Sequence, residues 1–107
     1  MEVEQVVMEL IINSGEARAY AHEALAKAKE GKYDEADELM EKANDMIGQT
    51  HSIQTSLLQD EAAGKGVQIS ILFVHAQDHL MTSITEKNLI SELIEMRKVI
   101  NPLLNIN

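Results

Sequence analysis

The segment SGEARAYAHEALAKA, residues 14–28, decides the fold. Small residues recur in it at steps of three and four, and the same spacing reaches back to the N-terminus. The positions are Val3, Val7, Leu10, Ser14, Ala17, Ala21, Ala24 and Ala28. Such spacing is a heptad seam, in which one apolar stripe of a helix faces a neighbouring helix. Because the second half of the seam is all alanine, we expect another helix to approach closely there.

Two further blocks continue this pattern, so the sequence predicts helices over residues 3–30, 34–62 and 67–100. Gly31 suits the left-handed turn after the first helix, and we expect Asp34 to cap the second. Asn101-Pro102 ends the third helix. A pause within the third helix near residues 85–88 is an alternative, with Thr85 capping a fresh helix. The seam of the second helix contains Ala36, Met40, Ala43, Ile47, Thr50, Gln54 and Leu57.

These three helices predict the fold class. Short connections between helices of this length make successive helices antiparallel neighbours. The chain has 107 residues, which is enough for one domain. Its few aromatic residues, which are 3% of the sequence, argue against strands. We therefore expect an all-α protein, an antiparallel up-down-up three-helix bundle, as a single domain over residues 1–107.

Composition excludes several classes of function. A net charge of −9 opposes binding to free nucleic acid and to an anionic membrane surface. The chain has no cysteine, and therefore no disulfide framework, no thiolate zinc site and no cysteine nucleophile. The sequence shows neither a signal peptide nor an apolar stretch long enough to span a membrane. We expect a soluble, cytoplasmic protein without membrane insertion.

Charge is distributed unevenly along the chain. Ten of the seventeen residues at positions 29–45 are charged, as in a solvated corner of a bundle. In the 24 residues at positions 62–85, only Lys65 and Asp78 carry a formal charge. A helix with so little charge around its circumference is not suited to face water. Either the core is locally apolar, or other subunits or partners cover the remaining faces, and we favour the second explanation.

Three ionisable side chains interrupt this uncharged helix, within the segment VHAQDHLM at positions 74–81. At about 100° per residue, Asp78 lies about 60° to one side of His75, and His79 lies about 40° to the other. The two imidazoles and the carboxylate therefore share one helix face. Burying such groups costs several kcal/mol unless they are paired or used. By contrast, we interpret His22 and His51 as structural or exposed.

Three kinds of chemistry compete for this group. The pattern His-x-x-x-His resembles half of a zinc-protease helix, but Ala76 stands where the catalytic glutamate belongs, and a third ligand is missing. General acid–base catalysis by His75 needs a substrate pocket, which a compact bundle is poorly equipped to form. The third possibility is covalent, with an imidazole that accepts a phosphoryl group and passes it on.

The chain resembles the IIA component of the lactose/cellobiose family of the phosphoenolpyruvate-dependent sugar phosphotransferase system. The resemblance covers essentially the whole chain, and the eight-residue segment at positions 74–81 is its most specific part. The matching segments, in order, are Ile12-Asn13-Ser14-Gly15-Glu16-Ala17-Arg18, Ala21-His22-Glu23-Ala24, Ala28-Lys29-Glu30-Gly31 with Ala36, His51-Ser52-Ile53-Gln54-Thr55, Glu61-Ala62-Ala63-Gly64 and Val74-His75-Ala76-Gln77-Asp78-His79-Leu80-Met81.

The resemblance implies a function and a set of site residues. His75 would carry the phosphoryl group, His79 would support it as a donor, and Asp78 would bind a metal on a trimer axis. The histidine-containing phosphocarrier protein would be the phosphoryl donor, and a cysteine of the IIB component would be the acceptor. The pathway would import a β-linked disaccharide of the lactose, cellobiose or chitobiose type.

The resemblance implies a homotrimer, and closed symmetry is the usual way for identical chains to cover an uncharged face. Three Asp78 carboxylates on the axis would repel one another, so we expect a divalent ion, Mg²⁺, between them and no organic cofactor. His75 lies in the middle of its helix, where no helix N-terminus can hold a phosphate. Gln77 points about 200° away from His75 on the same helix, so it could contact the phosphoryl group only across a subunit boundary or after rotation.

Two rival functions stay open at this point. A purely structural helical adaptor would explain the seams and the charge, and it would leave the His-Asp-His group without a purpose. A mononuclear zinc protein would explain that group and leave the remaining similarity unexplained. Phosphate labelling distinguishes the first rival from a phosphocarrier, and metal analysis with activity after chelation distinguishes the second.

Overall fold

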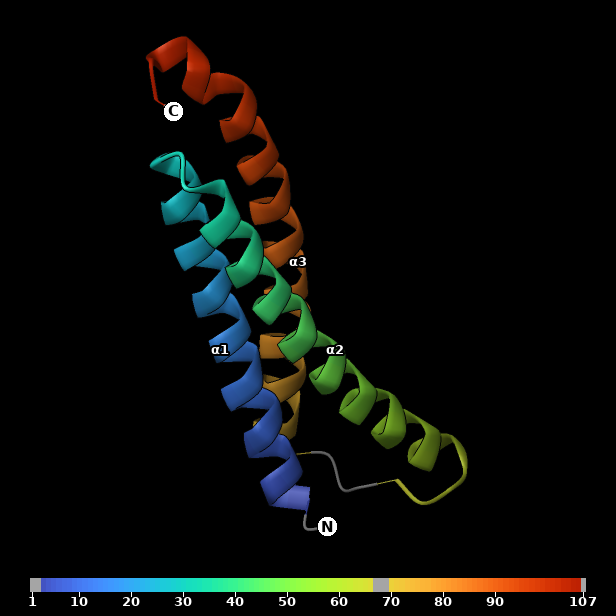
Figure 1. Ribbon diagram of the computed structural model, residues 1–107. Helices are drawn as coiled ribbons and strands as arrows, with labels where there is room; N and C mark the ends of the chain where they lie inside the picture. Colours follow the sequence, from blue (N-terminus) through green and yellow to red (C-terminus); the bar gives the residue numbers. More distant parts are fainter. Residues whose placement is uncertain (1–2, 67–69, 107) are drawn as a thin grey trace.

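The computed structural model of the protein describes residues 3–66 and 70–106 and forms a three-helix bundle (Figure 1). The helices are α1 (Val3–Lys29), α2 (Tyr33–Ala62) and α3 (Ile71–Ile100), followed by the 3-10 helix η1 (Asn101–Leu104). α2 runs antiparallel to α1, and α3 returns parallel to α1 in a bundle of 58 × 20 × 19 Å. The described residues contain no strand, and the predicted up-down-up bundle is confirmed.

The two predicted seams form the core of the bundle. Every seam position of α1 from Val7 to Ala28 is buried, and the α2 seam is buried from Ala36 to Gln54. Near the α1–α2 turn, the alanines of both helices pack with Met40, Ile90 and Ile94. Alanine has the smallest apolar side chain, so the helices approach one another closely here, as the sequence predicts.

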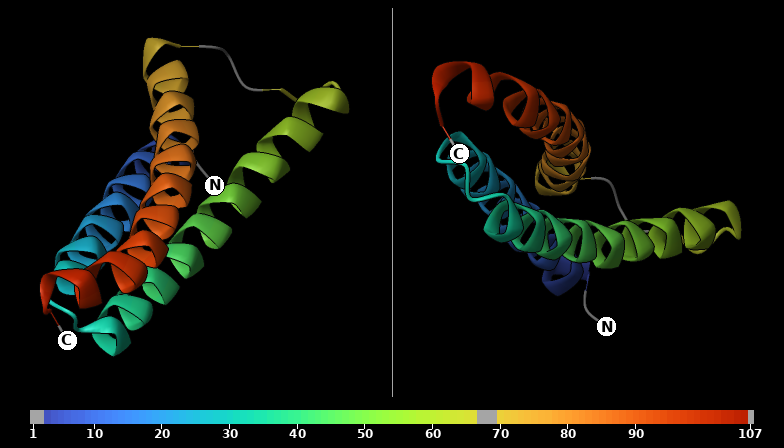
Figure 2. Two further views of the ribbon diagram at one scale, coloured as in Figure 1. Left: turned by 90° about the horizontal axis from the view of Figure 1, so that it is seen from above. Right: turned by 45° about the horizontal axis from the view of Figure 1, so that its top comes forward.

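α2 separates from the other two helices in its second half (Figures 1 and 2). Ile53 and Leu57 still pack against the second core cluster, which consists of Val7, Leu10, Ala76 and Leu80. Beyond Leu57, every residue from Leu58 to Gly66 is exposed. The end of the bundle that carries the N-terminus of α3 is therefore more open than the end at the α1–α2 turn.

The turn between α1 and α2 confirms one expectation and corrects another. Gly31 has φ 80°, the left-handed conformation that glycine adopts most easily. The expected cap at Asp34 is wrong, because α2 begins one residue earlier, at Tyr33, and its N-cap is Lys32 without a side-chain hydrogen bond. Asp34 lies instead in the first turn, where a carboxylate interacts favourably with the helix dipole.

α3 is one uninterrupted helix, so the alternative with a pause near residues 85–88 is wrong. The Thr85 hydroxyl donates to the Met81 carbonyl at 3.2 Å, a bond within the helix, and therefore caps nothing. The expected start at Val67 lies outside the described residues. The helix begins at Ile71 after the N-cap Ser70, whose hydroxyl accepts from the Phe73 backbone N–H at 3.1 Å.

The end of α3 is anchored to the α1–α2 turn. α3 ends at Ile100 before Asn101-Pro102, as expected, and the buried Asn101 begins η1. The Asn101 amide donates to the Ala28 carbonyl at 2.8 Å and to the Tyr33 hydroxyl at 2.9 Å. One side chain thus ties the end of the third helix to the end of the first and the start of the second.

Candidate functional site

The three ionisable residues of the predicted site lie together on α3. His75 and Asp78 are exposed, and His79 is half-buried. The rings of His75 and His79 meet edge to face, with centroids 4.6 Å apart and an interplanar angle of 85°. The spacing of four residues on a helix brings the two imidazoles into contact, as predicted. The structure therefore presents an accessible imidazole with a second imidazole beside it.

The two nitrogens of the His79 ring differ in their surroundings. Nδ1 is buried and has no hydrogen-bond partner among the described residues. Since the buried nitrogen is enclosed by protein, Nε2 is the ring nitrogen available to an incoming group. When the ring is protonated, Nε2 is a charged donor, which suits a phosphoryl group on the neighbouring His75.

Gln77 does not join this group. Its side-chain oxygen accepts a hydrogen bond from the Gln54 amide of α2, so Gln77 faces α2 while His75 is exposed on α3. This agrees with the separation of about 200° expected from the helical spacing. Within one chain, Gln77 cannot contact a group carried by His75.

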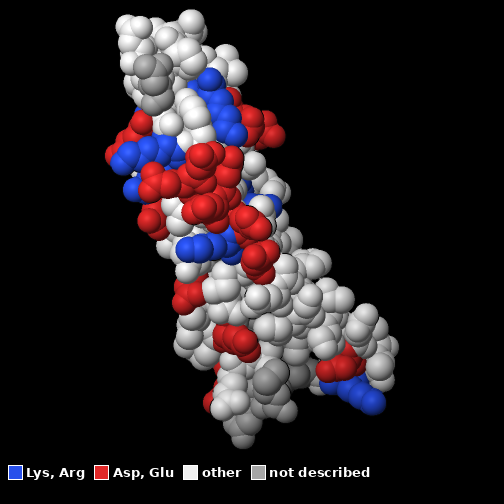
Figure 3. Space-filling model, in the orientation of Figure 1, with Lys and Arg blue, Asp and Glu red and all other residues white. Residues whose placement is uncertain are grey.

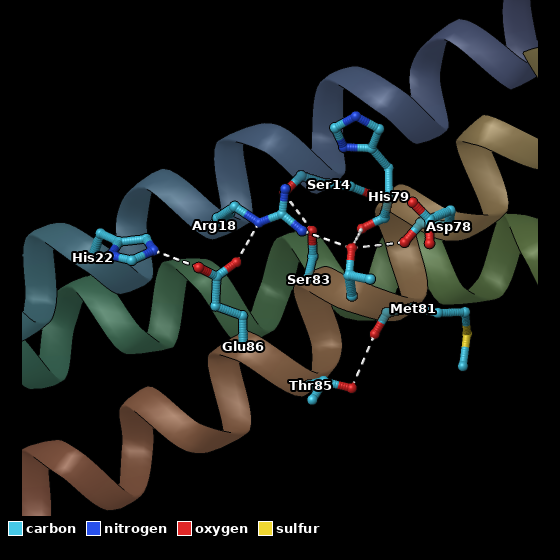
Figure 4. A network of polar contacts seen from close by, with 10 residues as sticks. Ser14, Arg18, His22, Asp78, His79, Met81, Ser83, Thr85 and Glu86 are labelled. Carbon is cyan, nitrogen blue, oxygen red and sulfur yellow. Dashed lines mark hydrogen bonds and ion pairs between the residues drawn. The ribbon is translucent and has the colours of Figure 1, made fainter.

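Beside the site, a polar network crosses from α1 to α3 (Figure 4). Arg18 of α1 forms an ion pair with Glu86 and donates to the Thr82 hydroxyl at 2.7 Å. Thr82 in turn donates to the Asp78 backbone carbonyl at 2.7 Å. His22 contacts the second carboxylate oxygen of Glu86 at 2.7 Å. The network holds α1 against α3 at Thr82 and Glu86, within two turns after the predicted site residues.

The network lowers the pKa of the Glu86 carboxyl below its ordinary value of 4.5. The hydrogen bond from His22 is the largest cause, and the charge and hydrogen bond of Arg18 act in the same direction. Glu86 is therefore a carboxylate at neutral pH, as its two partners require. His22, which the sequence suggested to be structural or exposed, is both exposed and part of this network.

Sequence reasoning assigned no role to Arg18 or Glu86. The contacting residues are 64 or 68 positions apart, and their pairing depends on the relative register of α1 and α3. One signal was present: Arg18 and His22 are four residues apart, so they share one face of α1 beside the alanine seam. This face therefore offers two basic groups to a single acidic partner.

Large apolar side chains are exposed along the whole length of α3. Of the large apolar side chains exposed among the described residues, Met8, Ile12 and Leu58 lie on α1 or α2. The others lie on α3 and η1, and they are Ile71, Leu72, Val74, Met81, Leu89, Leu93, Met96, Val99, Ile100, Leu103 and Leu104. Across the face that α1 and α2 present, charged residues instead gather near the α1–α2 turn, and the opposite half is mostly uncharged (Figure 3).

Metal binding within one chain finds no support in the described residues. They contain no group of three or more His, Cys, Asp or Glu side chains that could hold a metal ion. Asp78 is an exposed carboxylate on α3 without a cationic partner among the described residues. One carboxylate supplies only part of the oxygen ligand set that a divalent cation takes, so the other ligands would have to come from water or from other chains. Over the same residues, no helix is sufficiently long and apolar to cross a membrane.

Comparisons with known proteins define the class. Residues 5–98 match the family described as the lactose/cellobiose-specific IIA subunit of the phosphotransferase system. The N,N'-diacetylchitobiose-specific EIIA component of Escherichia coli strain K12 is 44% identical over 97 residues, which are 91% of this chain and 84% of that protein. The chain therefore belongs to the lactose/cellobiose IIA family of the sugar phosphotransferase system.

Solved structures agree with this assignment. The cellobiose-specific enzyme IIA of Bacillus anthracis superposes with a TM-score of 0.90 at 50% identity, covering 95% of this chain and 94% of that one. The chitobiose IIA of Escherichia coli, solved in complex with HPr, gives a TM-score of 0.83 at 42% identity, covering 94% of this chain and 98% of that one. The protein is a phosphotransferase, the IIA component of a sugar phosphotransferase system.

Proposed function

We propose that His75 is the residue that carries the phosphoryl group. The observation that supports this assignment is the exposed His75 ring in edge-to-face contact with His79, in the helix segment most specific to the family. An accessible imidazole is a competent nucleophile, and a second imidazole beside it can stabilise the negative charge that arrives. His22 is exposed too, but it faces Glu86, a carboxylate that would repel a phosphoryl group.

Both transfers are in-line displacements at phosphorus. In the first, a nitrogen of His75 attacks the phosphohistidine of the donor, and the phosphorus–nitrogen bond to the donor breaks as the bond to His75 forms. In the second, a cysteine thiolate of the IIB component attacks, and the bond to His75 breaks as a phosphorus–sulfur bond forms. This chain has no cysteine, so the second step requires a separate protein. Positioning and electrostatics carry most of the catalysis in such transfers.

The partners follow from the family. A IIA protein 42% identical to this chain was solved in complex with HPr, which supports the histidine-containing phosphocarrier protein as the donor. The IIB component of the same system is the acceptor. Relatives specific for N,N'-diacetylchitobiose and cellobiose support a β-linked disaccharide as the transported sugar. The carrier works in the cytoplasm, between its soluble donor and the cytoplasmic side of the transporter.

Two neighbours of His75 support the phosphorylated state. His79 donates through Nε2 from the same chain, because its buried Nδ1 leaves that nitrogen available. Gln77 faces α2 and serves the phosphoryl group of a neighbouring subunit. A phosphoryl group accepts several hydrogen bonds, so donors from two chains can act together.

The assembly in this proposal is a homotrimer in which α3 faces the axis. The apolar outer surface of α3 supports it, because one chain leaves this surface exposed along the entire helix. Asp78 is exposed on α3, so a threefold axis along this helix brings three carboxylates together. Their mutual repulsion calls for a divalent cation, and Mg²⁺ suits an oxygen ligand set.

Phosphate labelling tests the assignment of His75. The wild-type chain, incubated with phosphoenolpyruvate, enzyme I and the phosphocarrier protein, is expected to gain one acid-labile phosphate. His75→Ala is expected to gain none, whereas His22→Ala and His51→Ala, the matched controls, keep nearly full labelling. Label that persists in His75→Ala would refute the assignment. His79→Ala is expected to fold normally and to transfer the group slowly, because it removes a donor and leaves the nucleophile.

A further inference from the structure

Gln54 is a polar residue at a position where the α2 seam would ordinarily place an apolar one. Its side chain is 8% exposed, and it follows Ile47 and Thr50 on the stripe that faces the core. A buried amide destabilises the fold unless its polar atoms find partners. Replacing it by leucine would continue the seam, so the presence of glutamine calls for an explanation outside the packing of the core.

Both partners of the Gln54 amide nitrogen lie on α3, at the predicted site. The nitrogen donates to the side-chain oxygen of Gln77 and to the sulfur of Met81, at 3.8 Å. Thr50, the preceding polar residue of the seam, differs in this respect, since its hydroxyl donates to the Met46 carbonyl of its own helix at 2.7 Å. Gln54 therefore connects α2 to the site, whereas Thr50 finds its hydrogen-bond partner within α2.

The direction of the bond between the two glutamines follows from Met81. A thioether sulfur accepts hydrogen bonds and donates none. The Gln54 atom that contacts Met81 is therefore the amide nitrogen, and the same nitrogen contacts Gln77. Gln77 must therefore accept this hydrogen bond through its side-chain oxygen. Because an amide is planar, with oxygen and nitrogen on opposite sides of one carbon, the Gln77 N–H₂ group then points away from Gln54.

This orientation decides whether Gln77 presents a hydrogen-bond donor or an acceptor to a phosphoryl group. A phosphoryl group carries only acceptor oxygens, so it is stabilised by N–H donors and repelled by an amide oxygen. A free Gln77 amide could present either group. With its oxygen held by Gln54, it presents only donors. Gln54 also lies three residues before Leu57, after which α2 leaves the bundle, so it holds Gln77 at the edge of the packed region.

We propose that Gln54 is a positioning residue for phosphoryl transfer, which orients the Gln77 amide so that its N–H₂ group faces the phosphoryl group of a neighbouring subunit. The inference rests on the function proposed above, because it needs both the phosphorylated His75 and a second chain beside Gln77. Gln54 does not touch the phosphoryl group. It acts through Gln77 alone, and this distinguishes its role from that of a core residue.

Two substitutions of opposite character test this role. Gln54→Met keeps the length of the side chain and removes both donors, and Gln54→Glu supplies only acceptors. We expect phosphoryl transfer from the phosphocarrier protein to the intact protein to slow by roughly five- to tenfold in Gln54→Met. This is only part of the effect of a hydrogen bond to a charged group, because the Gln77 amide remains present and is no longer held in one orientation. Gln54→Glu is expected to be slower still, because Gln77 must turn its N–H₂ group toward the new carboxylate. Thr50→Val, the matched control on the same seam, keeps the wild-type rate.

A double-mutant cycle separates positioning from a structural role. In a Gln77→Ala background, Gln54→Met is expected to cause no further loss of rate, because the amide that it orients is absent. The same loss in both backgrounds would show that Gln54 acts through the fold, and a wild-type rate in Gln54→Met alone would also overturn the proposal. Sedimentation and circular dichroism are measured on every variant.

A spectroscopic readout on the wild-type protein holds even if Gln54→Met does not fold. In ¹⁵N-labelled protein, the side-chain amide protons of Gln77 are expected to resonate away from the positions of a free glutamine amide and to shift when the chain is phosphorylated. Resonances at the position of a free glutamine amide, unchanged by phosphorylation, would overturn the proposal. Absence of phosphate on His75 would instead refute the proposed function, so the two failures are distinguishable.

Discussion

The outer surface of the α1–α2 hairpin and the outer surface of α3 differ in what they expose. Near the α1–α2 turn, the hairpin is densely charged outside and packed through small alanines inside. α3 carries little charge over its first half, and its long apolar side chains remain exposed to its last turn and into η1. Near its turn, the hairpin buries its apolar residues within one chain. α3, by contrast, packs on one side and exposes large apolar side chains on the other. The phosphoryl-carrying residue that we propose lies on the incompletely packed helix.

The largest effect is expected from breaking the packed side of α3. Leu80 is fully buried among Val7, Leu10 and Ala76, so Leu80→Ala leaves a cavity and is expected to lower the free energy of unfolding by about 2–5 kcal/mol. Denaturant titration measures this loss. Leu58→Ala, a control at an exposed position of α2, changes the free energy by less than about 0.5 kcal/mol. Equal losses in the two variants would contradict the description of the core.

A second substitution tests the close packing of the hairpin. Ala24 is fully buried in the alanine seam, so Ala24→Leu must push the helices apart and is expected to cost about 1–3 kcal/mol. Ala26 lies two residues further on the same helix and is exposed. Thermal unfolding of Ala24→Leu and Ala26→Leu compares the same chemical change inside and outside the seam. A stable Ala24→Leu protein would show that alanine is not required there.

The seams show how far the sequence alone predicts this fold. Regular spacing identifies the buried face of each helix, because burial follows helical periodicity, and it also brings His75 and His79 together. Helix ends depend on single turns, and here the sequence misplaced the cap at Asp34. The alternative in which Thr85 caps a new helix was wrong for a related reason. A hydroxyl that can cap a helix can also donate to the backbone carbonyl one turn earlier, as Thr85 does.

The individual side-chain pairs between helices could not be predicted from the sequence. Arg18 meets Glu86 only because α1 and α3 adopt one particular register, and the periodicity within each helix does not give that register. The same holds for Gln54 and Gln77, which are 23 positions apart on different helices. Periodicity placed Gln54 in the seam, and only the structure shows that its partner is a residue of the predicted site.

The smallest effect is expected at the link between the hairpin and α3, which Glu86 of α3 forms with Arg18 and His22 of α1. The pKa of Glu86 is lowered in the folded protein, so Glu86 stabilises the fold above its ordinary pKa of 4.5, and the contribution is lost as the pH falls through the lowered folded value. Glu86→Gln is therefore expected to be less stable than wild type at pH 7, by less than about 1 kcal/mol, since the pair is partly exposed. Chemical denaturation of both proteins at pH 7 and at a pH well below 4.5 measures the difference in the free energy of unfolding.

The difference between wild type and Glu86→Gln should vanish at a pH well below 4.5, where both side chains are uncharged. Glu38→Gln, at an exposed position of α2, serves as the control and is expected to match wild type more closely at every pH. A stability difference that stays constant from neutral to acidic pH would contradict the ionic character of the link.

Sedimentation of the wild-type protein at micromolar concentration, with Mg²⁺ present, tests most directly whether other copies complete α3. The expected species has three times the chain mass of 11.9 kDa. A chelator should loosen the wild-type trimer at neutral pH. Asp78→Leu should remain trimeric in chelator, because apolar packing replaces the repulsion of three carboxylates. A wild-type protein that sediments as a monomer with the metal present would contradict this account of the α3 surface.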